Sequence, residues 1–175
     1  MLIAFVVVSS VFAFAALSTG LFSSNKAKAT ISAGLAEARD TFELKGSTQA
    51  SRAGTTQATA GVTQISFQVS KAAAGEAIDL TPGNTVIKYS DKTQTVTMNS
   101  TSESTATNIA SFGDTDSLLE VGEVFEIVLL DLKTQLATDL GTNGEFTIEL
   151  IPPSGAVLYI GRRPPVSLEA NMKLN

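Results

Sequence analysis

Residues 1–22 read MLIAFVVVSSVFAFAALSTGLF, and the first charged side chain does not appear until Lys26. As a helix, this stretch spans roughly 33 Å, close to the hydrocarbon thickness of a bilayer. A helix that is apolar on every face has to be surrounded by lipid or by other helices. A secretory signal peptide fits poorly, because it needs a basic segment, a shorter apolar run and a small-residue cleavage site. A permanent membrane anchor and a helix that passes from the membrane into a protein bundle both remain open.

Residues 26–45, KAKATISAGLAEARDTFELK, keep a helical period but acquire charges. Four apolar residues recur at intervals of three and four and therefore share one stripe: Ile31, Leu35, Ala38 and Phe42. Gly46 is a reasonable helix stop. The sequence thus predicts one helix over residues 1–46, about 65 Å long if continuous. The first half of this helix must be covered by apolar surroundings on every face. The second half has one apolar stripe and needs to be covered on that face only.

The remainder of the chain changes character twice. Residues 47–61, STQASRAGTTQATAG, are small and polar and are interpreted as a linker. From Val62 the apolar period becomes two, which is typical of half-buried strands. Strands are predicted at residues 62–70, 78–80, 85–89, 93–98, 124–132, 146–150, 156–160 and 165–174. Short strands separated by turn residues predict an antiparallel β-sandwich, immunoglobulin-like in size, over residues 62–175. The expected fold class is α+β.

The composition excludes several functions. The 175-residue chain has a net charge of −5, and its one adjacent basic pair, Arg162 and Arg163, forms no stripe, which argues against a nucleic-acid partner. There is no Cys, so a thiolate nucleophile, a disulfide and a zinc–thiolate site are impossible. There is no His, which is the usual general base near pH 7. We therefore expect neither an enzyme nor a cofactor.

Two polar motifs are candidate sites. Asn99 opens the sequon Asn-Ser-Thr in a Ser/Thr-rich stretch and is the best candidate for glycosylation. Asp114, Asp116 and Glu120 are weak candidates for a calcium loop, because they are closely spaced but lack the EF-hand spacing; a turn leading into a strand is the alternative. Glu120, Glu123 and Glu126 are interpreted as solvated charges, since a spacing of three puts strand neighbours on opposite faces.

Both ends of the chain resemble archaeal flagellins (archaellins). The resemblance is carried by residues 2–35, LIAFVVVSSVFAFAALSTGLFSSNKAKATISAGL, and by residues 144–175, GEFTIELIPPSGAVLYIGRRPPVSLEANMKLN, and it is loose over residues 47–120. Archaellins are related to type IV pilins and form the archaellum filament, which a membrane motor rotates for swimming. The family's precursors carry a basic leader, a processing site and a conserved acidic residue ahead of the matched part. We therefore expect the numbered chain to start downstream of these features, and none is assigned to a position in it.

The resemblance implies an extracellular structural subunit whose N-terminal helix lies in the filament core. Implied partners are copies of itself, paralogous archaellins, the membrane before assembly, and the motor and assembly machinery. It also implies a glycosylated outer face. The rival interpretations are an adhesive archaeal type IV pilin and a single-pass, membrane-anchored β-sandwich that binds a ligand. The helix residues expected to pack in the filament core are Leu2, Ile3, Phe5, Val8, Val11, Phe12, Phe14, Leu17, Leu21 and Phe22.

Overall fold

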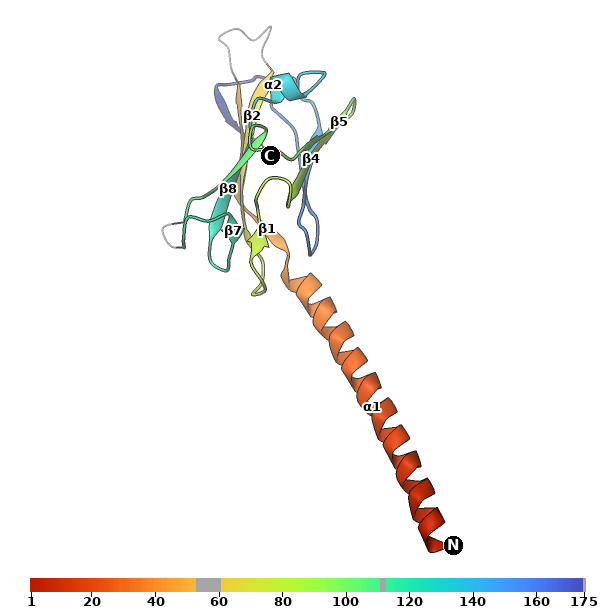
Figure 1. The fold of residues 1–175 in the computed structure, drawn as a ribbon. Helices are drawn as coiled ribbons and strands as arrows, with labels where there is room; N and C mark the ends of the chain where they lie inside the picture. Colours follow the sequence, from red (N-terminus) through yellow and green to blue (C-terminus); the bar gives the residue numbers. More distant parts are fainter. Residues whose placement is uncertain (53–60, 111–112, 175) are drawn as a thin grey trace. The chain divides into compact units, whose positions relative to one another are not determined.

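The computed structural model describes residues 1–52, 61–110 and 113–174 (Figure 1). The chain forms two compact units, Met1–Ala36 and Glu37–Asn175. The first unit holds most of α1 (Leu2–Arg39), an unbroken helix of 38 residues and therefore about 57 Å. Gly20 and Gly34 both lie inside this helix without interrupting it. The long N-terminal helix predicted from the apolar run is confirmed up to Arg39.

The prediction that the helix continues to residue 46 is wrong. The backbone bends at Asp40, and β1 (Phe42–Arg52) begins two residues later. Phe42 is 4% exposed and pairs with Lys71, so it belongs to the core of the second unit and not to the helical stripe. Sheet pairing and burial here override a local helical period. Gly46, at φ 65°, lies at an irregularity in β1 where the register shifts, and does not cap a helix.

The prediction of a linker over residues 47–61 is wrong for residues 47–52. Residues 47–52 are the second half of β1, where Gln49 and Ala50 pair with residues of both neighbouring strands. Val62 already begins β2. The remainder of that prediction, residues 53–60, lies outside the described residues. Strand β1 was missed because its polar, Gly-containing sequence carries little β propensity of its own.

The second unit is a β-sandwich, as predicted. One sheet has the order β11 (Asn171–Lys173), β1, β2 (Val62–Lys71), β8 (Val124–Leu129) and β6 (Ser104–Asn108). The other has the order β10 (Leu158–Arg162), β9 (Phe146–Ile151), β4 (Val86–Asp91) and β5 (Thr95–Met98). A two-stranded ribbon joins β3 (Ile78–Asp79) to β7 (Leu118–Leu119), and a short helix, α2 (Leu132–Gln135), follows β8. All the paired strands are antiparallel, and Figure 1 shows the two main sheets on opposite sides of the head.

The core lies between the two sheets. Ile65, Phe67 and Val69 point inward from β2, each at most 1% exposed, which confirms the alternation predicted there. From the other sheet, the rings of Tyr89 and Phe146 stack with their centroids 5.8 Å apart. Every buried apolar residue of the core lies between Phe42 and Leu174, and none belongs to α1. The head therefore has a complete core of its own.

Two further strand predictions needed correction. The run at residues 124–132 is not one strand, because β8 ends at Leu129 and the buried Leu132 begins α2 after Asp131 turns the chain with φ 47°. The C-terminal alternation at residues 165–174 forms a strand only at β11. On the apolar face of this alternation, Leu168, Met172 and Leu174 are buried, but Ala170 is exposed and Val166 is 78% exposed. The prolines that precede this segment cannot donate to a sheet ladder, so the chain runs as a loop there.

Candidate functional site

The outstanding surface of the molecule is the apolar segment of α1, which we call the helix surface and define as the apolar side chains from Leu2 to Phe22. No residue of α1 is buried within the chain. Phe12 is 73% exposed, Phe14 75% and Leu17 64%. The structure places all ten side chains predicted for the filament core on this helix, and all ten are exposed: Leu2, Ile3, Phe5, Val8, Val11, Phe12, Phe14, Leu17, Leu21 and Phe22.

Hydroxyl groups within this segment donate hydrogen bonds to backbone carbonyls of the same helix. The Ser10 hydroxyl donates to the Val7 carbonyl at 2.8 Å, and the Thr19 hydroxyl donates to the Ala15 carbonyl at 2.9 Å. Such bonds to the preceding turn let polar side chains enter an apolar environment without losing a hydrogen bond. By length and composition, α1 could cross a membrane. The helix surface is therefore compatible with lipid or with other apolar helices.

The size of the helix surface sets it apart from ordinary surface leucines. At roughly 100 Å² for each of the ten predicted side chains, it amounts to on the order of 1,000 Å². The largest apolar patch on a typical monomer is about 300–600 Å², and larger ones mark interaction sites. Leaving this area in water would cost on the order of 25 kcal/mol at about 25 cal/mol per Å². This surface must be covered in the functional state of the protein.

A buried ion pair fixes the backbone where β1 begins; we call it the Asp40 anchor. The Lys71 Nζ lies 3.3 Å from the Asp40 Oδ1, and these two side chains are 0% and 6% exposed. The Ser154 hydroxyl donates to the Asp40 Oδ2 at 3.2 Å. Gly75 and Gly155 pack so closely on Asp40 that a Cβ at either position would collide with it. Sequence reasoning missed this anchor, because Asp40, Lys71 at the end of β2 and Ser154 are far apart in the chain and share no spacing.

A second polar network closes the β4–β5 turn. Burial alone would raise the pKa of Asp91, but hydrogen bonds from the backbone and side chains of Thr93 and Gln94 outweigh it and lower the pKa to about 2. The Tyr89 hydroxyl also donates to Asp91 at 3.1 Å, and burial followed by this carboxylate raises the Tyr89 pKa. The Gln94 amide donates onward to the Thr138 carbonyl at 2.7 Å. The network ties the turn to the loop after α2.

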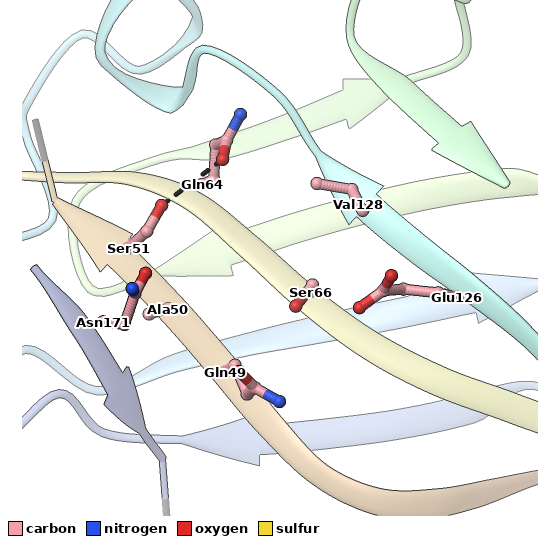
Figure 2. A pocket seen from close by; sticks show the side chains of 8 residues that line it. All are labelled: Gln49, Ala50, Ser51, Gln64, Ser66, Glu126, Val128 and Asn171. Carbon is pink, nitrogen blue, oxygen red and sulfur yellow. Dashed lines mark hydrogen bonds between the residues drawn. The ribbon is translucent and has the colours of Figure 1, made fainter. Parts of the chain in front are cut away.

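A shallow hollow lies on the outer face of the five-stranded sheet (Figure 2). Its volume is about 180 Å³, and its lining is mostly amide and hydroxyl side chains. Ser51 and Gln64 are bonded to each other across it at 3.4 Å. The only carboxylate among its lining residues is Glu126, whereas acid–base catalysis by a carboxyl pair needs two titratable groups. The hollow therefore offers no acid–base pair.

The glycosylation candidate occupies an accessible position. Asn99 is exposed in the loop that joins β5 to β6. The Glu103 carboxylate accepts hydrogen bonds from the backbone N–H groups of Asn99 and Ser100, at 3.0 and 3.1 Å. The loop is thus held in a defined shape with the sequon on its outside. This geometry is compatible with modification, and the occupancy of Asn99 stays a prediction.

The acidic candidates do not converge on a metal site in the part of the chain that the structure describes. The Asp114 Oδ1 accepts from the Asp116 N–H, and the Asp116 Oδ1 accepts from the Leu118 N–H, so both carboxylates shape a turn. The interpretation of Glu123 as a solvated charge is wrong, because this residue is 2% exposed. It accepts from the Asn108 amide at 3.0 Å and from the Glu120 N–H at 2.9 Å, and therefore closes the loop before β8.

Sequence comparisons identify relatives of this chain among archaeal flagellins. The model of the family described as archaeal-type flagellin matches residues 1–162. A probable flagellin 1 of Archaeoglobus fulgidus is 31% identical over 99% of this chain and 89% of its own length. A probable flagellin 1 of Aeropyrum pernix is 30% identical over 95% and 88% of the two chains.

Solved structures share the fold. The archaeal flagellum of Methanospirillum hungatei strain JF1 matches with a TM-score of 0.69 at 21% identity, over 99% of this chain and 93% of that one. Archaeal flagellin FlaB1 of Methanocaldococcus jannaschii matches with a TM-score of 0.62 at 11% identity, over 76% and 95% of the two chains. With a family model spanning both the apolar helix and most of the sandwich, the chain belongs to the archaeal-type flagellin family.

Proposed function

We propose that this chain is a structural subunit of the archaellum filament and that it polymerises through the helix surface, with the β-sandwich on the outside. The observation that carries the proposal is that the all-round apolar helix has no buried residue, whereas the head has a hydrophobic core of its own. A helix of this kind is stable outside a membrane only when other helices surround it. In a flagellin, copies of the same helix are the natural neighbours.

Assembly then consists of moving α1 from one apolar surrounding to another. Before assembly the helix waits in the membrane, which its length and composition allow. Passing from lipid into a bundle gains close packing, because lipid tails are as apolar as the side chains themselves. Release into water would instead expose the twelve Val, Leu, Ile and Phe side chains of the helix surface, at about 1.5–3 kcal/mol each before entropy is subtracted. The polymer is therefore effectively permanent once formed.

The form of the polymer follows from identical contacts. Head-to-tail contacts that do not close into a ring generate an open helical filament. The heads then cover the outside, in contact with the medium, and Asn99 is offered for glycosylation in an exposed loop. The subunit acts without catalysis or a cofactor, and its remaining partners are paralogous archaellins and the machinery that assembles and rotates the filament.

Electron microscopy of material sheared from cells tests this proposal most directly. We expect thin filaments that contain this chain as a major subunit, and a deletion strain that has lost swimming. Loss of attachment with swimming intact would favour an adhesive pilin instead. Finding the chain only in the membrane fraction, with no shed polymer, would favour a single-pass membrane protein and overturn the proposal.

Glycosylation needs its own test. Mass spectrometry of the purified subunit should give a mass above that of the polypeptide, and Asn99→Gln should remove one glycan increment. Asn84→Gln is a suitable control, because Asn84 is exposed in a turn but opens no sequon. A polypeptide of unmodified mass would refute glycosylation while leaving filament formation untouched.

A further inference from the structure

One edge of the head carries exposed apolar side chains around a hollow. Leu118 and Val121 are 37% and 60% exposed. A hollow of about 270 Å³ beside them is lined by Gly75, Ala77, Glu120 and Val121. Pairing of β3 with β7, and a bond from the Leu80 N–H to the Ser117 carbonyl at 2.9 Å, hold the two segments together. We call residues 75–77 and 114–121 the rim.

The rim is acidic as well as partly apolar. It carries Glu76, Asp114, Asp116 and Glu120, all exposed, and it contains no Lys or Arg. The sequence has no basic residue at all between Lys92 and Lys133. Within the described residues, none of the four carboxylates takes part in an ion pair. A partner that suits this surface has cationic and apolar side chains side by side.

The second half of α1 has this combination. Lys26 and Lys28 precede Ile31 and Leu35, which are 64% and 50% exposed. Lys28 and Ile31 are three residues apart and lie on neighbouring positions of one helical face. This segment lies beyond the helix surface, so packing of the residues up to Phe22 in a core would leave it uncovered. The same chain therefore offers both a complementary surface and a segment that fits it.

The rim lies close to the Asp40 anchor within the head. Gly75 of the rim packs directly against Asp40, so the rim lies at the end of the head where β1 begins. Lys28 precedes Arg39, the last residue of α1, by 11 positions, or about 17 Å along the helix.

From these observations we propose that the rim of one subunit docks on residues 26–35 of α1 of a second copy, with Lys26 and Lys28 against the rim carboxylates and Ile31 beside Val121. This inference rests on the proposed filament, and it adds a contact between helix and head to the contacts among helices. The contact covers the amphipathic half of α1 and fixes the orientation of each head in the filament.

Disulfide trapping tests the contact, because the natural chain contains no Cys. The test variant carries Ile31→Cys and Val121→Cys, and the control carries Ile31→Cys and Tyr159→Cys, since Tyr159 is 64% exposed on β10 of the other sheet. A disulfide forms only when the two Cα atoms lie within about 7 Å. Oxidised filaments of the test variant should give a ladder of dimers, trimers and higher species under denaturing, non-reducing conditions.

The outcomes separate the contact from the filament itself. Intact filaments without a ladder, or a cross-linked monomer that runs as a compact band, would overturn the docking contact and leave the proposed function standing. A ladder that is equally strong in the control would overturn it too. Absence of filaments from wild-type cells would refute the proposed function instead.

A second measurement covers the case in which the double-cysteine variant fails to assemble. Glu120→Gln filaments should release subunits at a lower temperature than wild type in low salt, and the difference should vanish in 1 M salt, where the screening length is about 3 Å. Glu169→Gln is the matched control, because Glu169 is an exposed carboxylate outside the rim. Equal behaviour of Glu120→Gln and wild type in low salt would refute the ionic part of the contact.

Discussion

Truncation of a single aromatic side chain on the helix surface should loosen the filament measurably. Phe12 is 73% exposed in the isolated chain, and full burial of a Phe side chain is worth about 3 kcal/mol. Covering the exposed fraction therefore contributes about 2 kcal/mol, and the cavity left by Phe12→Ala adds about 1–2 kcal/mol more. At about 1.4 kcal/mol per factor of ten, the subunit dissociation constant should rise by two to three orders of magnitude.

The assay is release of subunits from purified filaments on heating, measured by sedimentation. Phe12→Leu keeps an apolar side chain of similar volume and should stay within about 1.5 kcal/mol of wild type. Alanine is the better helix former, so weakening of α1 itself cannot explain a loss in Phe12→Ala. The head should unfold at an unchanged temperature in all three proteins, because its core contains no residue of α1. Phe12→Ala filaments as resistant as wild type would refute burial of the helix surface between subunits.

Three further predictions concern the head and can be measured on residues 37–175, which contain its whole core. Asp40→Asn should lower the free energy of unfolding by about 3 kcal/mol in urea titration, because it leaves the buried Lys71 ammonium without its counter-charge; an unchanged midpoint would mean that the pair is dispensable. Asp91, with its pKa lowered to about 2 from an ordinary 3.8, stabilises the head above pH 4 and loses that contribution as the pH falls through about 2. Asp91→Asn should therefore cost about 1 kcal/mol at pH 7, after allowance for solvent screening, and almost nothing at pH 2; a cost independent of pH would contradict the assignment. Gly155→Ala should cost about 2–4 kcal/mol, since φ is 98° and the added Cβ would strike the Asp40 carbonyl, whereas Gly141→Ala has open space and should change little in thermal unfolding.

The parts of the fold that sequence reasoning predicted are those with strong periodic signals. The unbroken apolar run up to Phe22 predicted the helix, and the alternation of Ile65, Phe67 and Val69 predicted a strand with one buried face. The sandwich followed from the number and spacing of such strands. These periodicities are local, so they can be recognised without knowing which strands pair with each other.

Features that depend on pairing across the chain escaped prediction. Phe42 fits the helical stripe by spacing, and only its pairing with Lys71 shows that it belongs to a strand. Glu123 has the sequence context of a surface charge, and only the donors folded around it make burial possible. The helix residues of the candidate site could be listed from the sequence, whereas the Asp40 anchor and the rim needed the structure.

The position of β1 in its sheet has a mechanical consequence. The strand that continues from α1 is not at an edge, since β11 pairs with it on one side and β2 on the other. A tension applied to the chain at Asp40 and directed along β1 pulls on two ladders at once, and their hydrogen bonds share the load in shear. If an edge strand were pulled perpendicular to its length, its hydrogen bonds would break one after another. In a rotated filament, β1 therefore resists extraction from the head better than an edge strand would.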